Sequence, residues 1–181
     1  MKKGLVITKN ANLFEIECEG EVVSLNASGK TKAGGIFVGD QVEFDENITK
    51  VLKRKNLLIR PPVANIDKMF IVIAPKPKPD FVLVDKLIIY CHLNDIEPIL
   101  LVNKFDLCDE EFIEIVQKSY KKHYKLLFLS AKSGKIENFE NQISGVCVLA
   151  GQSAVGKSSI INAEGSAYLF SILPFILNHV L

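Results

Sequence analysis

The sequence predicts an α/β protein in which a small β-barrel precedes a three-layer domain with a parallel sheet. Short β-prone runs fill residues 1 to about 60. From about residue 66, strand-like and helix-like patterns alternate. The phosphate-loop pattern G-x-x-x-x-G-K-[ST] stands at 151–158, directly after an apolar run. Together these observations predict a barrel followed by a domain that binds phosphate groups.

Five short runs with partial two-residue alternation predict the barrel strands. They are residues 4–8, 13–18, 21–25, 40–44 and 48–52. Five strands in such a short segment, separated by Asn, Gly and Asp turns, are typical of an OB-type barrel. Candidate RNA contacts lie in a flexible basic loop at 28–35 and after the fifth strand: Lys30, Lys32, Lys53, Arg54 and Lys55. The same domain also carries Glu15, Glu17, Glu19 and Glu21, so an ordinary solvated surface is an equal alternative.

Arg60-Pro61-Pro62 predicts a stiff connection after the barrel. We therefore expect an RNA-binding OB-fold domain at 1–62, a nucleotide-binding domain at 63–163 and a divergent apolar tail at 164–181.

The second domain is predicted from alternating patterns. The expected strands are residues 68–74, 98–102, 126–129 and 146–150, and the expected helices begin near Asp80, Asp109 and residue 135. The first helix should start at Asp80, because its apolar residues follow the spacing i, i+3, i+4, i+7: Val84, Leu87, Ile88 and Cys91. A stiff basic turn, Pro-Lys-Pro-Lys-Pro at 75–79, should precede it.

The phosphate loop supplies what a triphosphate requires. Gly151 and Gly156 let the backbone approach the phosphates, Lys157 supplies a cation, and a helix starting near Lys157 directs its positive end at them. The Ser158 hydroxyl would bind Mg²⁺. The full set of expected contacts is Gly151, Gln152, Ser153, Ala154, Val155, Gly156, Lys157, Ser158 and Ser159. The alternative is a Gly-rich turn without a ligand.

Asn103-Lys104-Phe105-Asp106 has the form of a guanine-reading motif and follows an apolar run. The Asp106 carboxylate would accept the two donors of the guanine edge, and adenine offers no such pair. The stem of Lys104 would lie on the base. The alternative is a strand-to-helix turn with Asp106 as the helix cap. A third turn, Ser130-Ala131-Lys132, ends another apolar run and would present a backbone N–H to guanine O6.

Composition places the chain among ordinary soluble proteins. Its 181 residues are 48% hydrophobic and 24% charged, with a net charge of +1, so charge alone favours neither nucleic acid nor membrane. Four scattered cysteines show no metal-ligand spacing and indicate reduced thiols in a cytoplasmic protein, with a zinc site as the lesser alternative. No export signal follows Met1.

Taken in order, the barrel, 60–67, 84–86, 103–107, 130–132 and 151–159 resemble the RsgA (YjeQ) family of circularly permuted GTPases. The guanine-reading motif precedes the phosphate loop, which is the reverse of the usual order. The resemblance covers residues 1 to about 163. It implies an OB-fold that docks on 16S rRNA of the 30S ribosomal subunit, a partial circularly permuted Ras-like GTPase domain, Mg²⁺ with GTP or GDP, and a monomer without membrane attachment that assists late maturation of the 30S subunit.

After Ala163 the resemblance ends. The family's switch segments, its Asp-x-x-Gly element and its zinc-binding domain do not appear in 164–181. We interpret the apolar tail as a truncated or frame-shifted product rather than a membrane anchor, because it is short and interrupted by Pro174. Two expectations follow: GTP turnover is impaired, and residues 146–150 form an exposed sheet edge unless the tail covers it.

Two other functions compete with a guanine-nucleotide site. One is an ATP-using P-loop enzyme, against which Asn103 and Asp106 argue. The other is a non-hydrolysing RNA-binding fragment in which the barrel alone folds.

Overall fold

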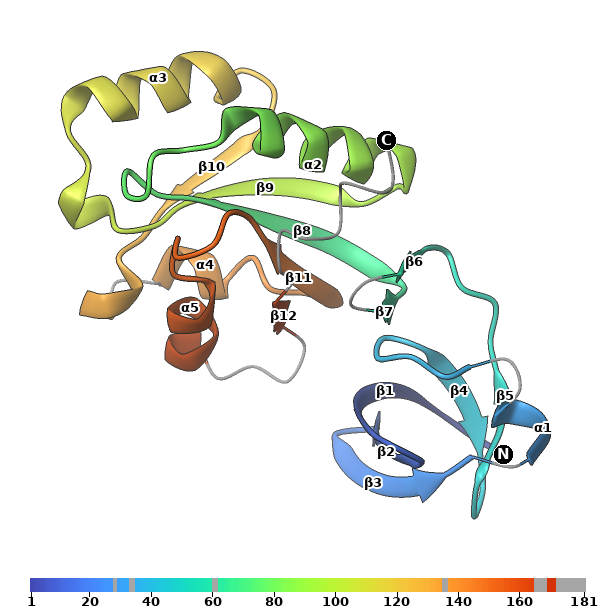
Figure 1. Cartoon of the computed structure of the whole chain (residues 1–181). Coiled ribbons are helices and arrows are strands. Elements are labelled where there is room, and N and C mark those ends of the chain that lie inside the picture. The colour runs from blue at the N-terminus through green and yellow to red at the C-terminus, as the bar shows by residue number, and fades with distance from the viewer. Residues whose placement is uncertain (28, 33–34, 60–61, 135–136, 165–168, 172–181) are drawn as a thin grey trace. The chain divides into compact units, whose positions relative to one another are not determined.

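The computed structural model describes residues 1–27, 29–32, 35–59, 62–134, 137–164 and 169–171 (Figure 1). The chain divides into two compact units between Ile66 and Asp67. Each unit has its own core, and each is described by itself below.

The first unit is a five-stranded antiparallel barrel. Its strands are β1 (Lys2–Asn10), β2 (Leu13–Cys18), β3 (Glu21–Asn26), β4 (Gln41–Phe44) and β5 (Ile48–Val51). They pair in the order β3-β2-β1-β4-β5, and a parallel bridge between Ala27 and Ile48 brings the two outer strands together. The five predicted barrel strands are therefore confirmed. Alternate positions turn inward, as at Val6, Phe14 and Ile16, and form a separate apolar core.

Two further features of this unit differ from the sequence predictions. The loop at 28–35 contains one helical turn, α1 (Gly29–Lys32), so it is not simply a flexible loop. The Pro-rich connection includes a small hairpin, β6 (Leu57–Ile59) with β7 (Pro62–Ala64), in which Ile59 faces Pro62. Proline fits here because a short edge strand does not need every backbone N–H for pairing.

The second unit is a five-stranded sheet with helices on both faces. Its strands are β8 (Ile66–Ile73), β9 (Glu97–Val102), β10 (Lys125–Phe128), β11 (Val146–Ala150) and β12 (Leu169–Ser171), in the order β10-β9-β8-β11-β12. Pairs β8·β9, β9·β10 and β11·β12 are parallel. β11 is apolar and buried along its whole length, and β8 and β9 are so over their last residues, Met69–Ile73 and Ile99–Val102, as expected for strands that are covered on both faces.

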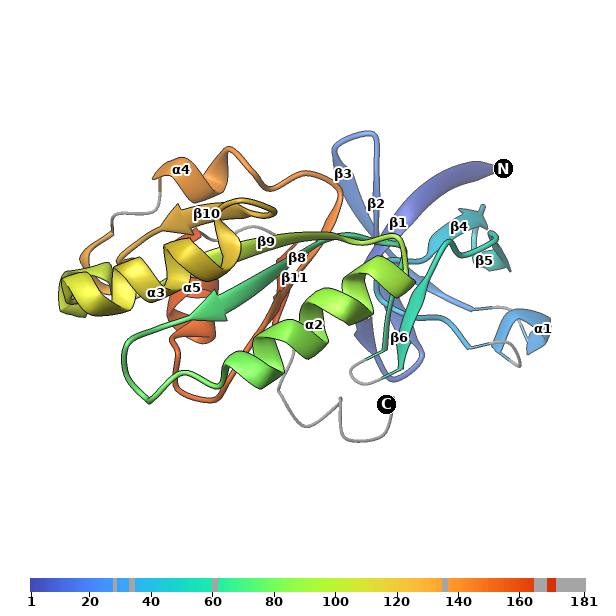
Figure 2. The same ribbon diagram turned by 90° about the horizontal axis from the view of Figure 1, so that it is seen from above.

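Helices α2 (Phe81–Leu93) and α3 (Glu110–Tyr120) cover one face of the sheet, and α4 (Glu137–Glu140) and α5 (Lys157–Glu164) cover the other (Figures 1 and 2). Asp80 caps α2 by accepting the Leu83 N–H, and the four predicted apolar positions of α2 are the buried ones. Asp109 caps α3 in the same way. Short 3₁₀ turns, η1 (Phe105–Leu107) and η2 (Ala131–Ser133), follow β9 and β10.

The sequence predicts an exposed edge at 146–150 unless the apolar tail covers it, and the tail covers the middle of that strand. Residues of the apolar tail form β12, which pairs with β11 in the register Cys147↔Leu169, Val148↔Phe170 and Leu149↔Ser171. Pairing satisfies the backbone groups that an edge strand would leave open. Residues 172–181 lie outside the described part of the chain. Among described residues, no helix is long and apolar enough to cross a membrane.

Candidate functional site

The three sequence motifs lie at one edge of the second unit's sheet. Asn103 follows β9, Ser130 follows β10 and Gly151 follows β11, and these strands share one sheet with β8 between β9 and β11. Because carboxyl ends of parallel strands meet at one edge, turns that are far apart in sequence become neighbours. Hydrogen bonds between the turns show how closely they approach.

Two glycines shape the phosphate loop. Gly151 has φ = 141°, and a Cβ there would lie 2.4 Å from the Val72 carbonyl oxygen. Gly156 has φ = 97°, and a Cβ there would lie 2.3 Å from Asn103 Nδ2. Both positions need a residue without a side chain, because the backbone conformation and the available space exclude one. The loop is therefore held close both to β8 and to the turn after β9.

Lys157 is the buried cation of the site. It opens α5 and is 5% exposed, and its Nζ donates to the carbonyl oxygens of Gly151 (2.8 Å) and Gln152 (2.7 Å). Burial lowers the pKa of Lys157 below its ordinary value of 10.5. Both of these partners are neutral carbonyls, so they solvate the charge of the ammonium without neutralising it. A group in that state attracts an anion.

Asn103 connects all three turns. Its side chain is 2% exposed; Nδ2 donates to the Val155 carbonyl oxygen at 2.9 Å, and Oδ1 accepts the Ala131 N–H at 3.2 Å. Its backbone N–H donates to the Ile73 carbonyl at 2.8 Å. The side-chain amide of Asn103 therefore ties the phosphate loop to the turn after β10, and its backbone N–H ties both to the end of β8. A buried amide with both ends paired fixes the relative positions of its partners.

Lys104 and Asp106 complete the turn after β9. Lys104 has a left-handed backbone (φ = 58°), and its Nζ donates to the carbonyl oxygens of Ala154 and Lys76, each at 2.8 Å. Asp106 accepts a hydrogen bond from the Ser130 hydroxyl through Oδ1, and its backbone N–H approaches Ser130 Oγ at 3.4 Å. Asp106 does not cap α3, since Asp109 does. The alternative interpretation of Asp106 as a helix cap is therefore wrong.

The remaining predicted contacts lie around this centre. Ser153, Ala154, Ser158, Ser159 and Lys132 are exposed, whereas Val155 and Ala131 are buried. Ser158 follows Lys157 in the first turn of α5, so its exposed hydroxyl would be available to hold the Mg²⁺ that the phosphate-loop pattern implies. In the described part of the chain, no three His, Cys, Asp or Glu residues form a metal cluster.

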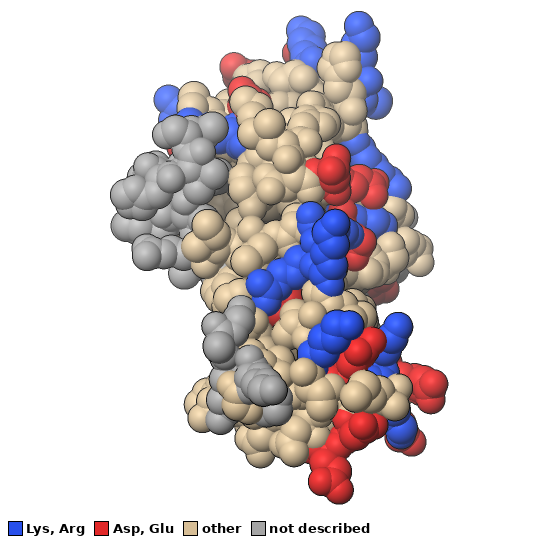
Figure 3. Space-filling model, turned by 90° about the vertical axis from the view of Figure 1, so that its right-hand side faces the viewer, with Lys and Arg blue, Asp and Glu red and all other residues tan. Residues whose placement is uncertain are grey.

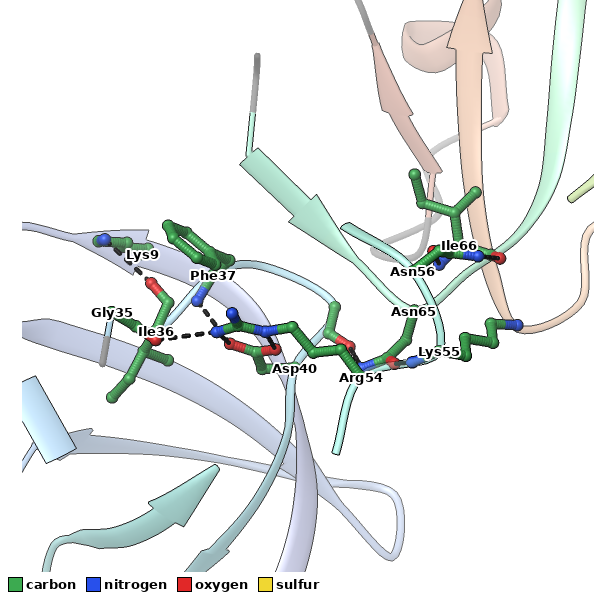
Figure 4. A network of polar contacts seen from close by, with 11 residues as sticks. Lys9, Gly35, Ile36, Phe37, Asp40, Arg54, Lys55, Asn56, Asn65 and Ile66 are labelled. Carbon is green, nitrogen blue, oxygen red and sulfur yellow. Dashed lines mark hydrogen bonds and ion pairs between the residues drawn. The ribbon is translucent and has the colours of Figure 1, made fainter. Parts of the chain in front are cut away.

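The predicted RNA contacts in the first unit fall into two groups. Figure 4 shows the Arg54 guanidinium beside the fully buried Asp40: Nε and Nη2 donate to its two carboxylate oxygens at 2.6 and 2.8 Å. Nη2 also donates to the Gly35 carbonyl at 2.8 Å, and the guanidinium lies 4.6 Å from the Phe37 ring centroid. Arg54 thus has an internal structural role, whereas Lys53 and Lys55 are exposed.

Charge on the surface is mixed. Figure 3 shows acidic and basic side chains interspersed on the face that it displays, without one continuous basic field. Lys30 and Lys32 belong to α1, and their side chains are outside the described set. Sequence reasoning also missed the role of the Pro-Lys turn at 75–79, whose backbone contacts Lys104. Its three prolines were the available signal, because they indicate a rigid segment.

Known proteins are similar to this chain in both sequence and structure. The family model described as RsgA GTPase matches residues 51–167. The Small ribosomal subunit biogenesis GTPase RsgA of Thermotoga neapolitana is 36% identical over 178 residues, covering 90% of this chain and 60% of the relative. The protein of the same name from Mycoplasmopsis pulmonis is 37% identical over 163 residues, covering 88% and 59%.

Two solved structures resemble the fold. YjeQ from Thermotoga maritima has a TM-score of 0.81 at 35% identity, covering 90% of this chain and 64% of that protein. YloQ, described as a circularly permuted GTPase, has a TM-score of 0.76 at 28% identity, covering 90% and 63%. The chain spans about three fifths of the length of the curated relatives that it matches.

Proposed function

Because the chain belongs to the RsgA GTPase family, we propose that it binds guanine nucleotide with Mg²⁺ and acts on the small ribosomal subunit. The observation that carries the proposal is the pair of hydrogen bonds made by Asn103. They join the phosphate loop to the turn after β10 and leave the Asp106 carboxylate in the same group of turns. This is the arrangement that one nucleotide needs in order to touch all three motifs.

Each group has a distinct part in binding. Asp106 accepts the N1–H and N2 amine of guanine, and adenine lacks that pair of donors. The N–H groups of 153–158 and the Lys157 ammonium hold the phosphates. Ser130, Ala131 and Lys132 border the base, and Ser158 would hold Mg²⁺, which neutralises charge on the phosphate oxygens. In the free protein, the Ser130 hydroxyl donates a hydrogen bond to Asp106 Oδ1. Guanine must therefore displace this hydrogen bond or share the acceptor with it.

Competition binding tests this proposal. Mant-GDP is titrated into the full chain with Mg²⁺, and unlabelled GDP and ATP are added as competitors. We expect saturable binding that GDP displaces and excess ATP does not. Asp106→Asn should weaken GDP binding at least ten-fold, because the amide replaces one acceptor with a donor that faces guanine donors.

Asp109→Asn is the matched control, since Asn also caps helices and the same charge is lost three residues away. Equal displacement by ATP would refute the guanine assignment in favour of an ATP-using enzyme. Equal losses of GDP affinity in the two variants would refute the role of Asp106 in reading guanine.

The reaction that we propose for this site is hydrolysis of GTP to GDP and phosphate. Residues 164–181 contain no Asp-x-x-Gly element, so we expect slow turnover by this chain alone. Phosphate release, measured with and without purified small ribosomal subunits, tests the reaction. If wild type released phosphate no faster than Lys157→Ala under both conditions, the proposed hydrolysis would be refuted and only nucleotide binding would remain.

The proposed partner is the small ribosomal subunit in the cytoplasm, with the barrel as the RNA-contacting unit and the protein acting as a monomer. The proposed phosphate contacts are Lys53, Lys55 and the basic segment at 30–32, and Arg54 supports them through its ion pair with Asp40.

Co-sedimentation with small ribosomal subunits, measured with a GTP analogue and without nucleotide, tests this partner. Lys53→Gln with Lys55→Gln should reduce the bound fraction several-fold; Lys121→Gln with Lys122→Gln in the second unit is the control. An unchanged bound fraction would remove the barrel from this role.

A further inference from the structure

The Pro-Lys-Pro-Lys-Pro turn at 75–79 runs beside the phosphate loop and is attached to it near both ends. At one end, Lys104 Nζ donates both to the Lys76 carbonyl and to the Ala154 carbonyl of the phosphate loop, each at 2.8 Å. At the other end, the Asp80 backbone N–H donates to Gln152 Oε1 at 3.3 Å. Between these points, Pro79 and Asp80 line a small cavity together with Gly151, Gln152 and Val155.

This turn is stiff and carries two exposed cations. Prolines at 75, 77 and 79 fix their own φ angles and restrict the residues before them, so Lys76 and Lys78 have little backbone freedom. Both lysines are exposed, and neither takes part in an ion pair among the described residues. A rigid backbone lowers the entropy lost when a long side chain settles on a ligand.

Resting on the nucleotide-binding function proposed above, we propose that Lys76 and Lys78 form a second cationic arm that contacts the phosphates of the bound guanine nucleotide. The buried Lys157 reaches the phosphates from inside the loop, and the arm approaches from the adjoining turn. The Debye length is about 8 Å at physiological salt, so exposed ammonium groups attract phosphates within that range, and added salt weakens the attraction. The arm should favour di- and triphosphates over monophosphates, because the attraction grows with the number of phosphate charges.

Nucleotide affinity of charge-removal variants tests the arm. Exposed ion pairs change affinity only modestly, so we expect about a three-fold weaker Kd for GDP in Lys76→Gln or Lys78→Gln, and about ten-fold in the double variant. The loss should be smaller for GMP, and it should shrink at high salt because screening removes the interaction in wild type as well. The salt dependence separates a charge effect from a structural one.

Two comparisons make the result decisive. The double variant Lys76→Arg/Lys78→Arg keeps both charges and should retain wild-type affinity. Lys121→Gln/Lys122→Gln removes two exposed charges beyond α3 and should leave Kd unchanged. If wild type binds GDP and the Gln double variant binds equally well, the arm is refuted while the proposed function stands.

Other outcomes are equally informative. If wild type shows no saturable guanine-nucleotide binding, both proposals fail. If the Gln double variant keeps its GDP affinity but loses co-sedimentation with small subunits, the lysines serve RNA, and the inference is overturned. Loss of affinity with an unchanged salt slope would indicate a distorted turn, and it would overturn the charge argument too.

Discussion

The two units each contain a cationic hub, half-buried at Arg54 in the barrel and buried at Lys157 in the sheet unit, and the hubs differ in how their charge is balanced. In the barrel, Arg54 is matched by the Asp40 carboxylate, and these hydrogen bonds raise the pKa of the guanidinium. In the sheet unit, the Lys157 ammonium donates to the carbonyl oxygens of Gly151 and Gln152, and burial lowers its pKa. A cation that is neutralised internally stabilises a fold. A cation that is only solvated is ready for an anion from outside.

The largest expected effect comes from breaking the barrel hub. Asp40→Ala leaves the guanidinium and the Phe37 N–H without their carboxylate partner, and we expect a loss of about 3 kcal/mol in unfolding free energy. All four tyrosines lie in the second unit and the chain has no Trp, so hydrogen exchange of residues 1–59 is the suitable probe. GDP affinity should be unchanged. Asp45→Ala, at a 59% exposed side chain, is the control, and an equal loss there would contradict the comparison.

The second prediction breaks the hub of the nucleotide site. Asn103→Ala leaves the Val155 carbonyl and the Ala131 N–H without their partner, and we expect the sheet unit to lose about 2 kcal/mol. GDP affinity should fall with it, in contrast to Asp40→Ala. Urea unfolding followed by Tyr fluorescence, with Asn162→Ala on the exposed side of α5 as control, measures the loss. An Asn103 variant that is as stable as the control would show that the turns hold together without this amide.

A smaller effect is expected at the cap of α2. Asp80→Ala removes the acceptor of the Leu83 N–H and should cost about 1 kcal/mol in the sheet unit. Asp80→Asn should restore most of that stability, because an amide oxygen also caps. Thermal unfolding measures both variants. Since the Asp80 backbone N–H, which contacts Gln152, is retained in both, GDP affinity should change little; a large change would mean that the cap itself positions the phosphate loop.

The smallest effect is a pH dependence of binding. Only the protonated Lys157 attracts phosphate, and its pKa in the free protein lies below 10.5. Bound phosphate should raise that pKa again, so GDP affinity is full below the free-state pKa and falls as the pH rises through it. Kd measured from pH 7 to pH 10 should show this fall in wild type. A pH-independent Kd would indicate that Lys157 does not face the phosphates.

Much of the fold was predictable because local patterns and tertiary packing agree. The apolar spacing of α2 identified its buried face, and Asp80 and Asp109 identified two helix starts. The five barrel strands followed from alternation and turn residues. The positions of the site turns followed from a single rule, that parallel strands bring their carboxyl ends to one edge.

The contacts that hold the site together were not predictable, because they join residues that are distant in sequence. Nothing local to Asn103 indicates a partner 52 positions away at Val155. The ion pair between Asp40 and Arg54 was missed for the same reason, and Arg54 looked like one more surface cation. The hairpin of β6 and β7 was missed because Pro62 argues locally against a strand, although tertiary pairing accepts it at an edge.

The parallel bridge between Ala27 and Ile48 has a consequence for how this protein is made. It closes the strands of the barrel with residues that all precede position 52, and Arg54 and the hairpin of β6 and β7 complete the first unit by position 66. The nucleotide pocket, in contrast, must wait for Lys157, although the base-reading turn emerged some fifty residues earlier. Translation therefore delivers a finished barrel well before the chain can hold a nucleotide, and the two units acquire their structures in that order.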